Sequence, residues 1–142
     1  MPYPRSAYDP TSGLVYFARM LDKIRLHAAD ELPPDYHPNL GTGMDGRMCR
    51  YLHVEYEKLR HRVLSETDDA DETILEWCFT HGRPLEEQDI LIWNSFASKR
   101  GWRDDDGASE YLKKIKADCG LANRDDIQTF FELFEVDEKR KD

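Results

Sequence analysis

The sequence has few cysteines, no long apolar run and no excess of basic side chains. Its 142 residues include three cysteines, Cys49, Cys78 and Cys119, which lie far apart and form no CxxC pair. No apolar segment approaches the roughly 20 residues that a membrane-spanning helix needs. The polar opening, residues 1–10, contains no apolar core of a signal peptide. We therefore expect reduced thiols in a cytoplasmic protein, without a disulfide framework or a membrane span.

Basic residues are also too few for a nucleic-acid-binding surface. Lysine and arginine total 20 against 29 acidic residues, which gives a net charge of −9. Residues 1–66 hold nine basic and nine acidic side chains, whereas residues 67–142 hold eleven and twenty. Binding to nucleic acid depends on neutralising phosphates with basic side chains. We therefore expect neither nucleic acid nor anionic membrane as a partner.

Apolar residues recur at helical spacing through almost the whole chain. The pattern predicts helices over residues 13–29, 46–65, 70–80, 86–99 and 107–118, and a sixth that follows Asn123 as its cap. The second helix has a candidate break at His53, and Asp69 with Glu72 resembles a capping box for the third. In the fifth, we expect Tyr111, Leu112, Ile115 and Cys119 on the buried side and Lys113, Lys114 and Lys116 on the solvent side.

This pattern predicts an all-α fold with about five to seven helices and little or no sheet. The length is typical of one domain, so we expect residues 1–142 to form a single compact bundle. The N-terminal arm, residues 1–10, and the charged tail, residues 137–142, are expected to be less ordered.

Residues 30–45 interrupt the helical pattern with three prolines and two glycines. These residues predict a non-helical connection that is long for a compact domain. A packed structural loop anchored by Tyr36 and Leu40 is one interpretation, and a functional loop is the other.

The start of the second predicted helix carries the best candidate for chemistry. Cys49 stands between Arg47 and Arg50 in its first turns. A helix N-terminus and nearby cations both favour a thiolate, and the arginines are suited to hold a small anion. Cys49 or His27 would perform any chemistry at such a site. The alternatives are a buried, inert Cys49 and a histidine satisfied at the edge of the core.

Trp93 and Asn94 are a second candidate for ligand binding. They lie in the fourth predicted helix, near a further tryptophan and two cations. An aromatic wall with one polar group is a common design of small-ligand pockets. The alternative is core packing with a hydrogen-bonded asparagine.

The sequence contains no P-loop, GxGxxG, GxSxG or HExxH motif. His53, Glu57 and His61 repeat at helical spacing, but eight residues of helix span about 12 Å, which is too far for two ligands of one ion. We therefore assign no catalytic residue, no metal site and no cofactor.

Four segments together carry a family resemblance: RSAYDPTSGLVYFARMLDKIRLH, RMCRYLHVEYEKLRHRV, DETILEWCF and ILIWNSFASKRGW. In this order they resemble a family of small bacterial proteins known as domain of unknown function 5069. The resemblance implies a bacterial, single-domain, cytoplasmic protein. It implies no activity, and it offers no site residues to transfer.

These observations favour an acidic interaction module that binds a protein partner or itself, and not an enzyme. The alternative is a small-ligand-binding protein or an enzyme. Its site would lie near residues 30–45 and the start of the second helix, where Arg47 and Arg50 would hold a small anion.

Overall fold

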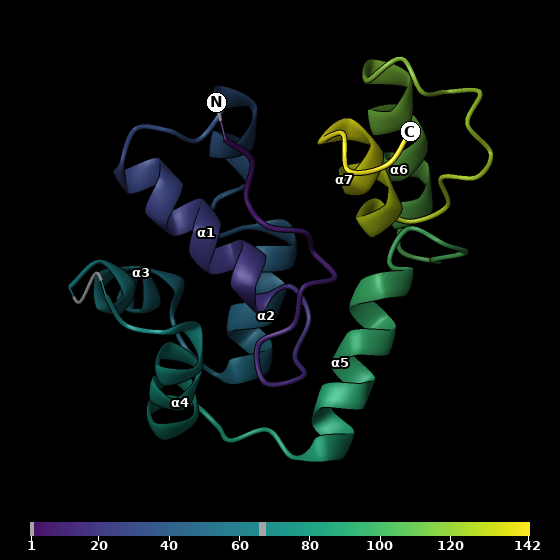
Figure 1. Ribbon diagram of the computed structural model, residues 1–142. Coiled ribbons are helices and arrows are strands. Elements are labelled where there is room, and N and C mark those ends of the chain that lie inside the picture. Colours follow the sequence, from purple (N-terminus) through teal and green to yellow (C-terminus); the bar gives the residue numbers. More distant parts are fainter. Residues whose placement is uncertain (1, 66–67) are drawn as a thin grey trace. The chain divides into compact units, whose positions relative to one another are not determined.

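The computed structural model describes residues 2–65 and 68–142, and within these residues the fold is all-α (Figure 1). Seven α-helices and one 3-10 helix form there, no strand forms, and one antiparallel bridge joins Thr11 to Leu14. The fold class expected from the periodicity is thus confirmed. The chain divides into two compact units, residues 1–91 and residues 92–142.

The first unit contains four α-helices, one 3-10 helix and the start of a fifth α-helix. They are α1 (Phe17–Ala28), η1 (Pro34–Asn39), α2 (Gly43–Leu52), α3 (Tyr56–Ser65), α4 (Asp71–His81) and the first residues of α5 (Glu87–Lys99). Helix α3 packs against α1, α2 and α4. The core side chains from these four helices are fully buried, and they include Phe17, Met20, Leu21, Met48, Leu52, Leu59, Val63, Ile74 and Leu75.

Helix α1 begins later than predicted, at Phe17 and not at residue 13. Ser12, Gly13 and Tyr16 have positive φ angles of 49°, 86° and 76°, which a right-handed helix cannot contain. The local apolar spacing was read as helix, but the chain turns here. The turn places Tyr16, a bulky side chain, at the left-handed N-cap of α1.

The segment 30–45 contains more helix than predicted. The 3-10 helix η1 includes Pro34 and Pro38. Pro34 stands in its first turn, where an unpaired amide is normal. Helix α2 begins at Gly43, three residues earlier than expected. The buried anchor of this segment is Leu32, whereas Tyr36 and Leu40 are only half-buried.

The predicted break at His53 is confirmed. His53 is the left-handed residue after α2, with φ 59°. Its amide donates to the Arg50 carbonyl oxygen at 3.2 Å, and the Val54 amide donates to the Cys49 carbonyl oxygen at 3.0 Å. This pair of bonds is a Schellman motif, in which glycine is the usual left-handed residue.

Helix α4 forms at nearly the predicted place, but its predicted capping box is wrong. Ala70 precedes the helix with no side-chain cap, and Asp69 instead accepts a hydrogen bond from Arg62 at 2.6 Å. Gly82 ends the helix as expected. A Cβ atom at Gly82 would overlap the carbonyl oxygen of Leu52, so this close approach requires glycine.

The second unit pairs α6 (Ala108–Asp118) with α7 (Phe130–Asp137). Leu112 of α6, Ile127 of the connection and Leu133 of α7 form its buried cluster. The prediction that Asn123 caps the last helix is wrong. The cap is Thr129, whose Oγ1 accepts from the Glu132 amide at 3.1 Å, while the Glu132 carboxylate accepts from the Gln128 amide at 3.0 Å.

The burial of three side chains on or next to α6 differs from the prediction. Tyr111 and Cys119 are exposed, whereas Lys116, predicted to face solvent, is buried. The Lys116 ammonium donates to the carbonyl oxygens of Arg124 at 2.7 Å and Ile127 at 3.0 Å. One cation therefore satisfies two carbonyls of a connection that has no helix of its own.

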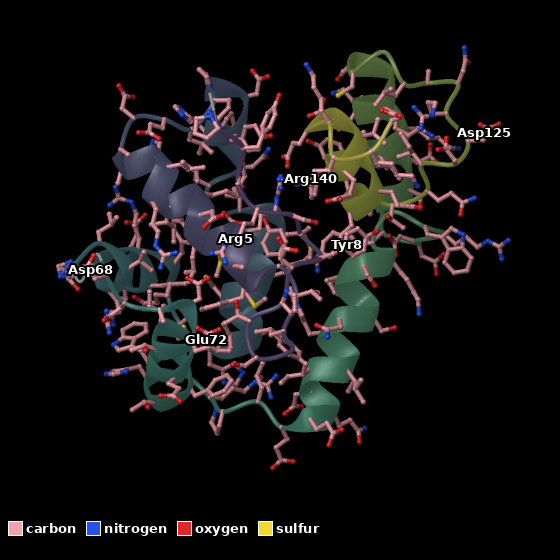
Figure 2. All side chains as sticks on the ribbon, viewed as in Figure 1. Arg5, Tyr8, Asp68, Glu72, Asp125 and Arg140 are labelled. Atoms are coloured by element: carbon pink, nitrogen blue, oxygen red, sulfur yellow. The ribbon has the colours of Figure 1, made fainter. Side chains whose placement is uncertain are left out.

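The charged tail is held against α7. Arg140, labelled in Figure 2, forms ion pairs with Glu135 and Glu138. The amides of Arg140 and Lys141 also donate to the carbonyl oxygen of Glu135. These contacts attach residues 138–142 to the last helix of the second unit.

Candidate functional site

Cys49 does not occupy the environment that the sequence suggested. Because α2 begins at Gly43 and ends at Leu52, Cys49 lies in its C-terminal half. The prediction that it lies at the helix start is therefore wrong. Burial, followed by the charge of Asp45, raises the pKa of its thiol from 9.0 to about 12, and Arg50 only partly opposes this. With this pKa the thiol keeps its proton at neutral pH, whereas the thiolate is the nucleophile.

The other candidates near this segment are not gathered around Cys49. Arg47 is half-buried and Arg50 is exposed. The ring of His27 lies edge-on to that of His37, with centroids 4.8 Å apart. Within residues 2–65 and 68–142, no hydrogen bond or ring contact joins His27 to Cys49. The geometry offers no base for a thiol nucleophile.

The sequence did not reveal a buried polar cluster that links α1, the 30–45 segment and α2. Asp45 is 0 % exposed and Lys23 is 5 % exposed. The Lys23 Nζ and the Tyr16 hydroxyl both donate to Asp45 Oδ1, at 3.0 Å and 2.6 Å. The Gly41 amide donates to Asp45 Oδ2 at 3.1 Å. Both carboxylate oxygens are therefore satisfied inside the protein.

This cluster is built for stability and not for catalysis. Burial, followed by the charge of Asp45, raises the pKa of Tyr16 well above its usual value, so the phenol keeps its proton and donates it. Tyr16, Lys23 and Asp45 are all at least nine-tenths buried, so a substrate has no access to them. A sequence signal did exist, because Tyr16 and Lys23 are two helical turns apart on the apolar side of α1.

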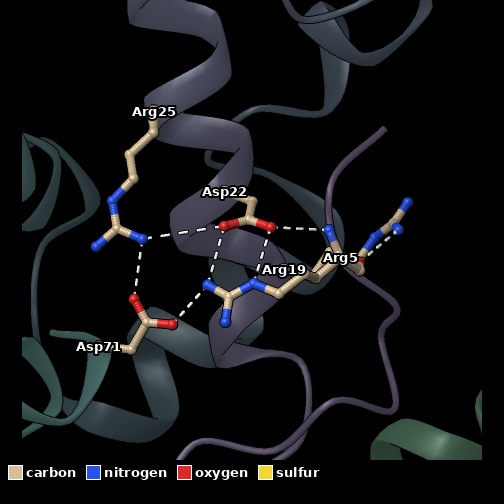
Figure 3. A network of polar contacts seen from close by, with 5 residues as sticks. All are labelled: Arg5, Arg19, Asp22, Arg25 and Asp71. Atoms are coloured by element: carbon tan, nitrogen blue, oxygen red, sulfur yellow. Dashed lines mark hydrogen bonds and ion pairs between the residues drawn. The ribbon is translucent and has the colours of Figure 1, made fainter. Parts of the chain in front are cut away.

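A second polar network joins the N-terminal segment to α1 and α4 (Figure 3). Arg5 makes two side-chain hydrogen bonds to Asp22, both at 2.9 Å, and a third to Asp71. Arg25 pairs with Asp71 at 2.9 Å, and Arg19 donates to the Arg5 carbonyl oxygen. The neighbouring carboxylates raise the pKa of Arg5. Asp22 and Asp71 pair with Arg5 and Arg25, so the network ties the N-terminal segment to α1 and α4.

The second unit has an open groove beside α5. Its volume is about 420 Å³, and its lining residues are Ile92, Ser95, Phe96, Lys99, Trp102 and Asp104. Three of them are large apolar side chains that remain exposed: Ile92 at 53 %, Phe96 at 38 % and Trp102 at 44 %. The chain turns at Gly101, which has a φ angle of 101°. Trp102, the next residue, also lines the groove.

Trp93 and Asn94 do not line this groove. Trp93 is buried, with its ring centroid 6.0 Å from that of Phe96, and Asn94 is half-buried. The aromatic wall that sequence reasoning placed at Trp93 is provided by Phe96 and Trp102 instead. The signal was helical spacing: Ile92 and Phe96 are four residues apart and therefore share a face.

Some of the charged side chains around the groove form ion pairs and others do not. The carboxylate of Asp104 accepts from the Gly101 amide at 2.6 Å and lies 3.6 Å from Arg100. The Lys99 ammonium donates to the Ser95 hydroxyl at 3.0 Å. Arg103 lies over the Trp102 ring at 4.8 Å. In the described part of the chain, neither Lys99 nor Arg103 has a carboxylate partner.

Two kinds of feature are absent from residues 2–65 and 68–142. No group of three or more histidine, cysteine, aspartate or glutamate side chains within them has a metal-binding arrangement. No helix among them is long and apolar enough to cross a membrane.

A model of the family described as a domain of unknown function (DUF5069) matches residues 1–140. The chain belongs to this family. The DUF5069 match extends across both compact units, so both are part of what defines the family. A comparison with curated proteins gives no match to this sequence. The DUF5069 description assigns no ligand, so the function must be argued from the geometry.

Proposed function

We propose that this protein is an interaction module that holds an apolar segment of another protein in the groove beside α5. One observation carries the proposal: Ile92, Phe96 and Trp102 are exposed together along one open groove. Large apolar side chains that gather on a surface are typical of binding sites, whereas singly exposed ones need no explanation. Aromatic side chains, tryptophan above all, supply much of the binding energy at protein interfaces.

The form of the groove suits a peptide better than a small metabolite. It is open, and its polar lining groups, Ser95, Lys99 and Asp104, stand beside the apolar ones. An apolar centre with a polar rim is the usual composition of a protein interface. The rival site, near residues 30–45, has less support because Cys49 is buried and protonated.

We infer that the module works in the bacterial cytoplasm and has no nucleic-acid partner. The free cysteines Cys49, Cys78 and Cys119 support a reducing compartment. The net charge of −9 supports the exclusion of nucleic acid.

Site-specific photo-crosslinking tests the proposed function. Ser95 is exposed in the groove, and a benzoylphenylalanine in its place will cross-link a bound partner in cells that express the protein. We expect one partner whose cross-link disappears with Phe96→Ser and persists with Tyr111→Ser. Tyr111 is a matched control, because it is 52 % exposed in the same unit but does not line the groove. Cross-links that are identical with and without Phe96 would refute the docking site.

A further inference from the structure

We propose that His27 and His37 form a binding site for a divalent transition-metal cation. His27 lies in the last turn of α1 and His37 in the last turn of η1, so the two ligands come from different elements of the first unit. Both side chains can be reached from solvent, since His27 is half-buried and His37 is exposed. The inference goes beyond the proposed function, because it concerns a second site with its own chemistry.

The spacing of the two rings is that of two imidazoles bound to one ion. Their centroids are 4.8 Å apart and their planes are inclined by 73°. An imidazole nitrogen lies about 2.0–2.1 Å from a zinc ion, which puts the centroid of its ring about 3.2 Å from the ion. Two rings bound at the angles of square-planar or tetrahedral coordination, about 90–110°, therefore have centroids about 4.5–5.2 Å apart. The observed spacing lies within this range.

The hydrogen bond of His37 leaves its ring in the form that a metal ligand needs. His37 Nε2 lies 3.1 Å from the carbonyl oxygen of Leu32. Because a carbonyl oxygen only accepts, Nε2 carries the proton and Nδ1 keeps its lone pair. Histidines that bind metals commonly donate their other N–H to a backbone carbonyl, which fixes the tautomer and the ring orientation. In the described part of the chain the His27 ring makes no hydrogen bond, so its lone pair is also available.

The chain between the two histidines is ordered. Asp30 has a left-handed backbone, with φ 57°, and its amide donates to the His27 carbonyl oxygen at 3.1 Å. The next amide, that of Glu31, donates to the Leu26 carbonyl oxygen at 2.8 Å. Leu32 is 2 % exposed and anchors the segment in the core. The two rings are thus held near each other before an ion binds, so binding loses little conformational freedom.

The charges around the pair favour a cation. Residues 27–37 contain no lysine or arginine, and their three carboxylates are exposed: Asp30, Glu31 and Asp35. Two arginines of α1 lie nearby. Arg25 pairs with Asp71 at 2.9 Å, and Arg19 lies over the Tyr36 ring at 6.0 Å. The three carboxylates outnumber these two arginines, one of which is already neutralised, so the local field attracts cations.

The pair supplies two ligands and leaves the other coordination positions open. Across residues 2–65 and 68–142, no third histidine, cysteine, aspartate or glutamate completes a metal-binding group. Water would take the remaining positions. Imidazole suits zinc, copper and nickel, whereas calcium and magnesium prefer oxygen ligands. The site therefore selects a transition metal over these two hard cations.

Isothermal titration calorimetry of the full-length protein with zinc chloride tests the site. We expect one Zn²⁺ per chain, bound at least about tenfold more weakly by His27→Gln and by His37→Gln, since removing even an outer partner of a metal ligand costs about 10–100-fold. Glutamine at position 37 can still donate to the Leu32 carbonyl oxygen. Circular dichroism of every variant checks that the helical content is unchanged.

Two controls and a second cation make the assignment specific. His61→Gln is the matched control, because His61 is an exposed histidine on α3. Cys119→Ser removes the exposed thiol, and neither change should alter the affinity. Calcium chloride at the same concentration should not displace zinc. Zinc should also raise the melting temperature of the wild type and not that of His27→Gln, because an ion that binds the native state stabilises it.

Four results would overturn the histidine pair as a metal site. They are an affinity for zinc that neither His27→Gln nor His37→Gln lowers, a loss in only one of these two variants, a loss with His61→Gln or Cys119→Ser, and displacement of zinc by calcium. The last result would assign the binding to carboxylates.

Discussion

The buried pair of Lys23 and Asp45 gives a sharp stability prediction. Asp45→Asn keeps the size and an acceptor oxygen, but it removes the charge that neutralises the Lys23 ammonium 3.0 Å away. The Lys23 side chain is 6 % exposed, so water cannot replace the lost partner. Breaking a buried ion pair from one side costs about 3–5 kcal/mol. Since the free energy of unfolding of a small domain is about 5–15 kcal/mol, this loss is a large share of it.

Lys23→Met tests whether the loss comes from the stranded cation. In that variant the Asp45 carboxylate keeps the Tyr16 hydroxyl and the Gly41 amide as donors, so the expected loss is smaller than for Asp45→Asn. The double variant removes both charges and should recover part of the stability. We expect a coupling of about 2 kcal/mol or more between the two positions.

Urea unfolding followed by far-ultraviolet circular dichroism at neutral pH measures these free energies. Glu55→Gln is the control, because its ion pair with Lys58 is about three-quarters exposed. It should change the free energy of unfolding by less than about 0.5 kcal/mol. An Asp45→Asn variant within about 1 kcal/mol of the wild type would refute the reasoning, since this is below the penalty for any buried unpaired charge.

Three further predictions concern thiols and backbone. Iodoacetamide should label Cys119 first, because a pKa raised to about 12 lowers the thiolate fraction of Cys49 and Cys78 roughly a thousandfold relative to a thiol of pKa 9.0. Mass spectrometry of the native protein measures the order of labelling, and early labelling of Cys49 would contradict the prediction. His53→Gly should raise the free energy of urea unfolding by about 0.5–1 kcal/mol, because glycine adopts the left-handed conformation without strain, and an unchanged or lower value would count against this. Gly82→Ala should lower the free energy of urea unfolding by about 1–3 kcal/mol, because the new Cβ overlaps a backbone carbonyl oxygen. A melting temperature equal to that of the wild type would show that the loop adapts freely.

Much of the fold could be predicted because helical periodicity reports which face is buried. The helix predicted over residues 70–80 forms as α4, Asp71–His81, and the helix predicted over residues 107–118 forms as α6, Ala108–Asp118. The break at His53 was also correctly placed. These features depend on residues close together in sequence, where spacing and turn chemistry determine the outcome.

The errors arise where tertiary contacts override local patterns. Lys116 looked solvent-exposed because lysine on a helix usually is, yet carbonyls of a distant connection satisfy its charge inside the unit. Asp45 lies in the first turn of α2, yet its carboxylate accepts from Tyr16 and Lys23, more than twenty residues earlier in the sequence. Pairings of this kind depend on the packed structure, and the spacing of apolar residues does not encode them.

The candidate sites also show that local sequence suggests residues and that packing decides their environment. The proximity of Cys49 to arginines in the sequence suggested a reactive thiol, but burial decided its protonation. The aromatic segment around Trp93 predicted a ligand pocket at Trp93 and Asn94, whereas Phe96 and Trp102 line the groove. Composition can thus locate an aromatic surface, whereas the identity of its exposed side chains depends on how the helix rotates.

The environment of Lys116 also makes the second unit observable by itself. Lys113, Lys114 and Lys116 lie within one turn of α6, yet the first two are exposed and the third is buried. Reductive methylation of the native protein should therefore modify two amines of this turn and spare the third. Loss of that protection while the buried Lys23 amine stays unmodified would report the opening of residues 92–142 with the first unit still folded, so the two amines together distinguish local from global unfolding.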